Sequence, residues 1–195
     1  IRLYHPDDLS KDSIRERKRT SLTAMRILAI CEKINEELHQ KQKIYVLVQL
    51  MDFISFSTGT AEKELEFLET VAEAFNLDTD EYRDMLAFIL GTGEGSLRKE
   101  RMLVISSDSA YDLQGIKHLY NENLRDRLLF LYVASTNTLL MRYEGRENLL
   151  LNGQNIFSGQ TYVFEHGSSV RGAGISPVYY NDVEEVYVGE AFKLR

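Results

Sequence analysis

Hydrophobic residues in the first half of the chain recur at steps of three and four, the period of an α-helix with one face toward a core. The first such stripe consists of Ile27, Cys31, Ile34 and Leu38. It follows a Ser13–Glu16 pair, which has the spacing of a capping box at a helix start. We therefore expect a first helix over about residues 14–40.

Three further helices are expected before the glycine-rich stretch at residues 91–95. Residues 44–56 are apolar almost all round, so this segment is expected to form a central core helix that its neighbours cover on all sides. After a break at residues 57–60, an apolar stripe over residues 61–75 runs beside a row of glutamates and predicts an amphipathic helix. A second capping box begins at Asp78 and predicts a fourth helix.

The second half of the chain shows short apolar runs separated by turn residues, a pattern typical of β-strands. Strands are predicted over residues 102–105, 128–134 and 139–143, with a hairpin turn at residues 135–138 between the last two. Asparagine–glycine, serine–glycine and histidine–glycine pairs mark further turns up to Gly167.

These patterns predict an α+β fold. Residues 1–95 are expected to form an all-α bundle of about four helices, and residues 96–195 a small, mainly antiparallel β domain. The boundary falls near residues 91–100, where glycine and charge concentrate.

Composition narrows the class of protein. The chain has 195 residues, 44% of them hydrophobic, and a single cysteine, so it can bury a core but cannot form a disulfide scaffold. No apolar run approaches the roughly 20 residues of a membrane helix, and no signal peptide is recognisable. We expect a soluble, cytoplasmic protein, and we expect the chain, which begins at Ile1, to be a piece of something longer. The net charge of −7 argues against a nucleic-acid partner.

The sequence offers no catalytic or cofactor-binding residue. Its four histidines and its lone cysteine match no nucleophile motif and no zinc-ligand spacing. The glycine-rich stretch at residues 91–95 follows a helix and lacks the lysine–serine or lysine–threonine pair of a phosphate-binding loop, so we interpret it as a helix stop and linker. We therefore expect this chain neither to bind ATP tightly nor to hydrolyse it.

Charge clusters supply the remaining candidates. Asp52, Glu62 and Glu66 belong to an acidic segment that either binds a divalent cation or forms a solvated helix face. A basic cluster early in the first helix is formed by Arg15, Arg17, Lys18 and Arg19. Cations at this end of a helix oppose its dipole. The default interpretation is that they are paired inside the fold or solvated. The alternatives are that they pair with the acidic face, with an anionic membrane surface or with a partner.

Part of the helical half resembles a known family. The similar segments are residues 43–54, the Thr58–Gly59 break, residues 64–77 and the pair at residues 81–82. Together they resemble the TerB-like helical domain of tellurite resistance. That family commonly ends its second helix with an Ala-Asp-Gly-like turn whose aspartate takes part in metal binding. Thr58 stands before the glycine here, and because of this departure from the family's pattern we expect weak or absent metal binding.

The second half resembles a more particular group. The similar segments are residues 151–156, 159–172 and 175–183. They resemble a region of bacterial ABC transporter ATP-binding proteins that carry a TerB-like N-terminus. In those proteins the region lies just ahead of the nucleotide-binding domain. The resemblance implies that ATP and Mg²⁺ bind in a downstream domain beyond Arg195, and that this ATPase and its membrane domains are the partners. Interaction candidates in these segments are Asn152, Arg171, Tyr179 and Tyr180.

The resemblances imply one function and leave one alternative. The expected function is that of a non-catalytic, cytoplasmic accessory region of an ABC transporter ATP-binding protein, which regulates by domain docking or ligand sensing and meets the membrane only through its parent. The alternative is a free-standing TerB-like metal-binding or stress-response protein. The chain also resembles forkhead-associated domains more faintly, but it lacks the elements with which that family binds phosphothreonine.

Overall fold

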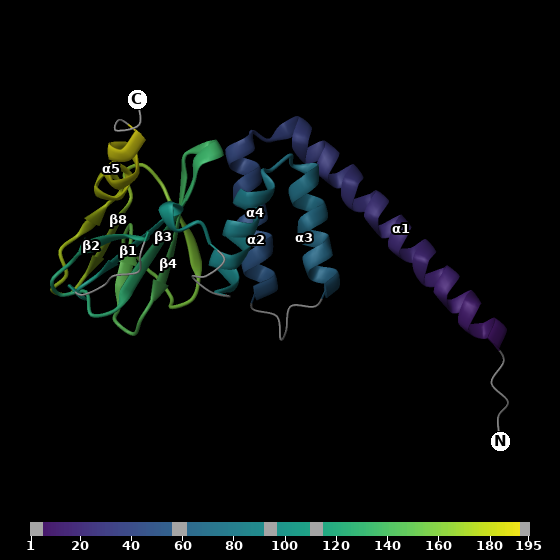
Figure 1. Ribbon diagram of the computed structural model, residues 1–195, viewed down its shortest axis with the longest axis horizontal. Helices are drawn as coiled ribbons and strands as arrows, with labels where there is room; N and C mark the ends of the chain where they lie inside the picture. Colours follow the sequence, from purple (N-terminus) through teal and green to yellow (C-terminus); the bar gives the residue numbers. More distant parts are fainter. Residues whose placement is uncertain (1–5, 56–61, 92–96, 110–114, 192–195) are drawn as a thin grey trace, which may run out of the picture.

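The N-terminal half forms four helices, as expected, but the first begins at Pro6, so Ser13 lies inside it and the predicted capping box at its start is wrong. The computed structural model describes residues 6–55, 62–91, 97–109 and 115–191, with side chains from residue 22 to residue 188 of these ranges. The helices are α1 (Pro6–Glu37), α2 (Gln40–Ser55), α3 (Glu62–Ala74) and α4 (Thr79–Leu90). Helices α2, α3 and α4 stand side by side, whereas α1 runs diagonally away from them toward the N-terminus (Figure 1).

The ends of α4 follow from local chemistry. The carboxylate of Asp78 accepts hydrogen bonds from the backbone amides of Asp80 and Glu81, which confirms the predicted cap. The helix ends at Gly91 in the left-handed conformation, with φ of 65°, which a glycine adopts without strain. The turn expected at Thr58–Gly59 and the rest of the glycine-rich stretch lie outside the described residues.

The expectation that α2 is covered on all sides is wrong. Its residues Ile44, Leu47, Val48 and Met51 are fully buried, but Phe53 is 78% exposed. Helix α2 packs against α3, α4 and the sheet, and these neighbours leave one of its faces open to solvent.

The C-terminal half contains two sheets. The first has the order β2-β1-β3-β4-β7, in which only the β1–β2 pair is parallel. Its strands are β1 (Met102–Ser106), β2 (Lys117–Tyr120), β3 (Arg127–Val133), β4 (Thr138–Glu144) and β7 (Thr161–Phe164). The second sheet is antiparallel, with the order β6-β5-β8-β9. Its strands are β5 (Leu149–Leu151), β6 (Gln154–Asn155), β8 (Ser169–Gly172) and β9 (Val178–Tyr179).

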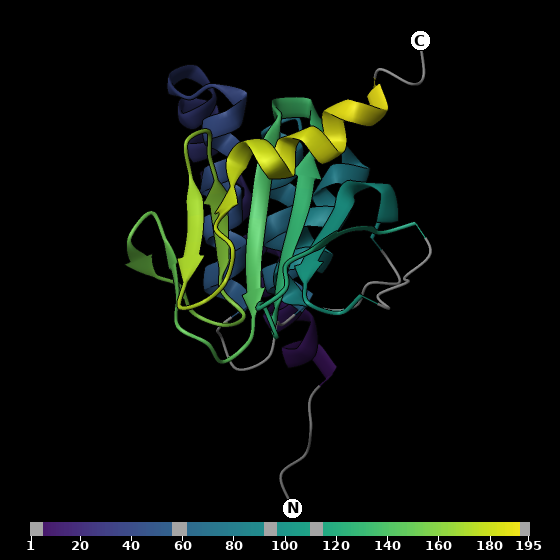
Figure 2. The same cartoon turned by 90° about the vertical axis from the view of Figure 1, so that its left-hand side faces the viewer.

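The first sheet is the middle layer of the molecule. Helices cover one of its faces, and the second sheet with helix α5 (Tyr180–Ala191) covers the other (Figures 1 and 2). Alternate residues of β1 divide between the layers: Met102 and Val104 join the helical core, while Leu103 and Ile105 join the core beneath the second sheet. Burial on both faces explains why the central strands are continuous apolar runs.

The predicted hairpins are confirmed, and one helix was missed. Strands β3 and β4 are joined through a short 3-10 turn, η2 (Ala134–Thr136), and β5 and β6 through Asn152 and Gly153, which have φ of 52° and 85°. Helix α5 lies in the part of the chain that was expected to be mainly β, and the sequence pattern did not predict it. Its buried Tyr180, Val183 and Tyr187 recur at steps of three and four, the signal that should have identified it.

The bundle and the first sheet share one continuous apolar core. Residues of all four helices and of β1, β3 and β4 belong to the same buried cluster. The division into domains near residue 95 therefore stays a prediction from the sequence. None of the helices in the described part of the chain is long and apolar enough to cross a membrane.

Candidate functional site

Helix α1 attaches to the bundle along one face near its C-terminal end. Cys31 is buried there, and Ile27 and Ile34 pack against the helical core beside it. The side-chain amide of Asn35 donates a hydrogen bond of 2.7 Å to the carbonyl oxygen of Ala74, at the end of α3. These contacts account for the apolar stripe that predicted the helix.

A second apolar face of α1 remains exposed. Leu22 is 58%, Met25 64% and Leu28 49% exposed there. Ile30 is 59% exposed as well, but it follows Leu28 by two residues and lies on another side of the helix. A single exposed apolar side chain is ordinary, whereas large apolar residues clustered on one element mark an interaction surface. We name Leu22, Met25, Leu28 and Ala29 the α1 docking face.

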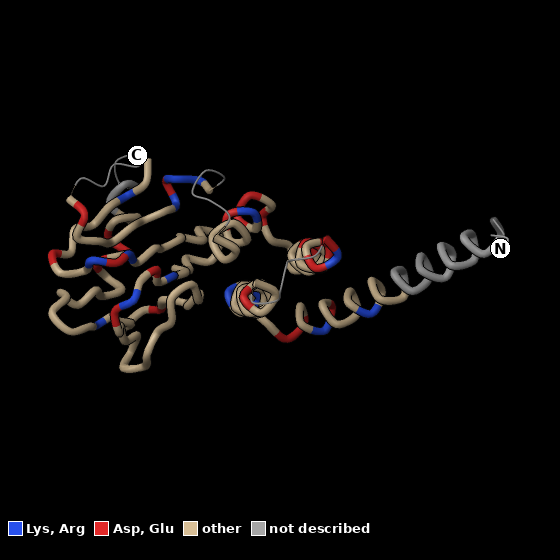
Figure 3. The backbone as a smooth tube through the Cα atoms, turned by 90° about the horizontal axis from the view of Figure 1, so that it is seen from below, with Lys and Arg blue, Asp and Glu red and all other residues tan. Residues whose placement is uncertain are grey.

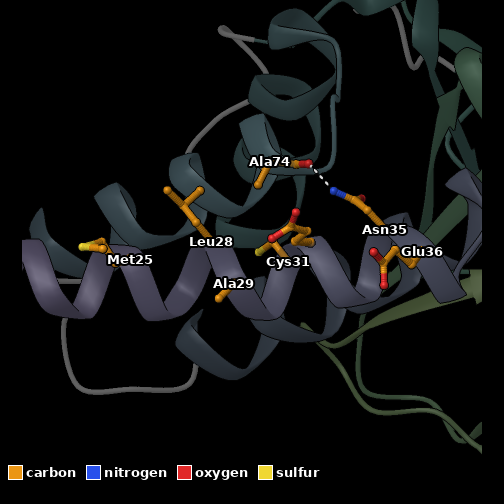
Figure 4. Close-up of a pocket in the computed structure, with 8 residues that line it drawn as sticks. Met25, Leu28, Ala29, Cys31, Asn35, Glu36 and Ala74 are labelled. Atoms are coloured by element: carbon orange, nitrogen blue, oxygen red, sulfur yellow. Dashed lines mark hydrogen bonds between the residues drawn. The ribbon is translucent and has the colours of Figure 1, made fainter.

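A groove of about 620 Å³ runs along this face. Its apolar lining comes from Met25, Leu28, Ala29, Cys31 and Ala74. Figure 4 shows Met25 at one end of the groove and the Asn35–Ala74 hydrogen bond toward the other.

Charge is distributed unevenly along α1. Glu32 and Glu36 line the C-terminal end of the groove and are exposed. The basic residues Arg15, Arg17, Lys18 and Arg19 fall within α1, but their side chains lie outside the described part. Figure 3 shows acidic residues in red at the C-terminal end of α1, where the helix turns into α2. The apolar segment of α1 is therefore followed by acidic residues on its C-terminal side and preceded in the sequence by basic residues on its N-terminal side.

The carboxylates proposed as metal ligands occupy different environments. Asp52 is 7% exposed and accepts a hydrogen bond of 3.4 Å from the backbone amide of Thr161, whereas Glu62 and Glu66 are exposed on α3. Among the residues with described side chains, no three His, Cys, Asp or Glu gather as metal ligands. Burial raises the pKa of Asp52, and the Thr161 amide and the Arg142 guanidinium partly offset that rise.

Arg142 joins the helices to the sheet, a role that the sequence analysis did not find. Its Nη1 atom donates hydrogen bonds of 2.9 Å to the carbonyl oxygen of Phe88 and 2.7 Å to that of Ile89, in the last turn of α4. A cation at this end of a helix satisfies free carbonyl groups and complements the helix dipole. Its partners are backbone atoms of a distant element, so no sequence motif marks the contact.

The interaction candidates of the second half divide into two pairs. Asn152 and Tyr180 have structural partners: the amide of Asn152 bonds to Ser168 and Ser169 across the β5–β8 edge, and buried Tyr180 donates to Glu184. Arg171 and Tyr179 are exposed on the second sheet. Arg171 and Tyr179 therefore offer side chains to a partner, Asn152 is exposed but engaged within the fold, and Tyr180 is buried.

A serine–histidine contact also escaped the sequence analysis. Ser106 Oγ lies 3.0 Å from His118 Nε2 across the β1–β2 pair. Ser106 is 2% exposed, so a substrate cannot reach its hydroxyl group. The contact therefore holds two strands together and does not form an accessible nucleophile and base.

Comparisons with known proteins identify no relative. No protein-family model, no curated protein and no solved structure matches this chain. The resemblances to the TerB-like domain and to the region ahead of an ABC-type ATPase therefore stay predictions from the sequence.

Proposed function

We propose that this chain is a non-catalytic accessory region of an ABC transporter ATP-binding protein, and that it acts by docking through α1. The observation that carries the docking role is the exposed cluster of Leu22, Met25 and Leu28 along a groove. The resemblance of residues 151–183 supplies the proposed parent, its ATP and Mg²⁺ and its position at the inner face of the membrane.

A docking region of this kind regulates through binding. When a docking contact forms more tightly in one state of the attached ATPase than in another, it shifts the balance between the two states and changes turnover without any chemistry of its own. The α1 docking face suits this role because its apolar side chains are exposed, while Ile27 and Ile34 on the opposite side of the helix pack against the helical core. The α1 docking face is therefore fixed in position relative to the helical core.

The identity of the proposed parent can be tested from the gene sequence, before any protein is made. We expect the natural reading frame to continue past Arg195 into a Gly-x-x-x-x-Gly-Lys-Ser/Thr phosphate-binding loop. A frame that ends without such a loop contradicts the ABC assignment and favours the free-standing alternative.

The docking role is tested by ATP turnover of the full-length protein. Met25→Glu places a charge in the α1 face, and Phe53→Glu places the same charge on an exposed apolar position of α2. We expect Met25→Glu to change turnover by about fivefold or more, the lower end of ordinary coupling energies, and Phe53→Glu to leave it unchanged. Equal turnover in both variants would remove the case for regulation through α1.

A further inference from the structure

The docking face lies on a line of regularly spaced residues. Leu22, Met25 and Ala29 follow one another at three and then four residues, the spacing of a seam between two helices. The same alternation continues to Glu32 and Glu36 toward the C-terminus. All five residues are exposed.

The alternation also continues toward the N-terminus. It reaches Lys18, Arg15 and Lys11, all within the range of α1. One line of the helix is therefore basic from Lys11 to Lys18, apolar in the middle and acidic at Glu32 and Glu36, and Asp8 precedes its basic part. Seam residues spaced alternately by three and four keep to one side of a helix that coils around a partner.

This order of charges makes α1 complementary to itself in one orientation. In a parallel pair of α1 helices, basic would face basic and acidic would face acidic, which is unfavourable. An antiparallel pair that crosses at Met25 places Lys18 opposite Glu32 and Arg15 opposite Glu36, because both pairs are centred at or next to residue 25. The apolar residues then meet in the middle.

We propose that the partner of the α1 docking face is a second copy of this chain, bound through an antiparallel α1–α1 seam; the proposal rests on the proposed function for the location of the docking surface. Helices α2, α3 and α4 stay where they are in each copy. The seam is a local addition to the fold and exchanges no element between copies.

The course of α1 allows this pairing. The helix leaves the bundle diagonally, so its N-terminal half extends past α3 (Figure 1). In the antiparallel pair, this half of one copy lies beside the C-terminal half of the other, where the groove of about 620 Å³ is lined by Leu28 and Ala74 (Figure 4). Each copy thus covers Leu22, Met25 and Ala29 of the other.

The charge order favours a protein partner over a lipid surface. Helices that lie on anionic membranes carry basic residues along their polar flanks. The α1 seam instead ends in Glu32 and Glu36, which an anionic surface would repel. A second α1 offers both signs of charge at the required positions.

A charge-exchange experiment tests the proposal by sedimentation equilibrium of the chain at micromolar concentrations. One variant carries Arg15→Glu and Lys18→Glu, and the other carries Glu32→Lys and Glu36→Lys. We expect the unmodified chain to dimerise, each variant alone to lose affinity at least about tenfold through like-charge repulsion, and an equimolar mixture of the two to recover the dimer. Circular dichroism of each variant checks that the helices remain folded.

The other outcomes overturn the proposal in distinguishable ways. A monomer at all concentrations refutes the second copy, while the turnover test of Met25→Glu still decides the docking role. A dimer that neither variant weakens lies elsewhere on the molecule. Vesicles containing phosphatidylserine serve as a further probe: a monomeric chain that binds them through α1 assigns the face to a membrane.

Discussion

Replacing Arg142 by methionine should destabilise the whole chain, because this side chain connects α4 to the first sheet. Methionine keeps much of the aliphatic stem in place and removes the guanidinium group. The substitution leaves the carbonyl groups of Phe88 and Ile89 without their charged donor. It also removes the cation that lowers the cost of burying Asp52.

The size of the effect follows from these contacts. A hydrogen bond to a charged group contributes about 1.5 to 3 kcal/mol, and Arg142 makes two such bonds to α4. Water can replace part of each, because the carbonyls belong to a helix end and the Arg142 side chain is 15% exposed. We therefore expect Arg142→Met to lower the free energy of unfolding by about 2 to 4 kcal/mol.

Urea denaturation measures this loss. Arg171→Met is the matched control, because Arg171 is exposed on β8 and surface substitutions of this kind change stability by about 0.5 kcal/mol or less. The two variants should unfold with the same dependence on urea and different midpoints. A loss in Arg142→Met no larger than in Arg171→Met would refute the structural role assigned to the guanidinium group.

Three further substitutions test the fold. Leu47→Ala should cost about 2 to 5 kcal/mol of unfolding free energy because Leu47 is fully buried, whereas Phe53→Ala should cost little; equal urea midpoints would contradict this burial. Burial raises the pKa of Asp52, so the folded state keeps this proton to a higher pH than the unfolded state. The stability of the unmodified chain relative to Asp52→Asn should therefore fall as the pH rises above about 4, and parallel pH profiles of unfolding would contradict the shift. Asn152→Ala should lose about 1 to 2 kcal/mol in thermal unfolding, because it strains a turn with φ of 52° and removes the acceptor of the Ser169 amide; an unchanged melting temperature would show that the turn is not needed.

The helices were predictable because their signals are local. The cap at Asp78, the glycine end at Gly91 and the stripe through Cys31 all depend on neighbours within a few residues along the chain. Helix α5 was missed although Val183 and Tyr187 carry the same signal, because turn residues and short apolar runs dominate the segments before it.

The docking face could be predicted only in part. The sequence shows that residues 22–31 are apolar on more than one side of a helix, but the position of α3 decides that Cys31 is covered and Met25 is not. Likewise, sequence spacing placed Asp52 near other carboxylates, whereas the fold turns it toward the Thr161 amide of a distant strand. The contacts of Arg142 with backbone carbonyls leave no trace in the pattern of residue types.

Disulfide trapping of α1 is the most direct test of the proposed docking surface and its partner. In an antiparallel seam centred at Met25, this residue lies opposite its own copy, so a Met25→Cys variant should form a covalent dimer rapidly under mild oxidation. Phe53→Cys places an exposed thiol on α2, away from the seam, and should stay monomeric under the same conditions. Equal, slow cross-linking of the two variants would contradict the α1–α1 seam.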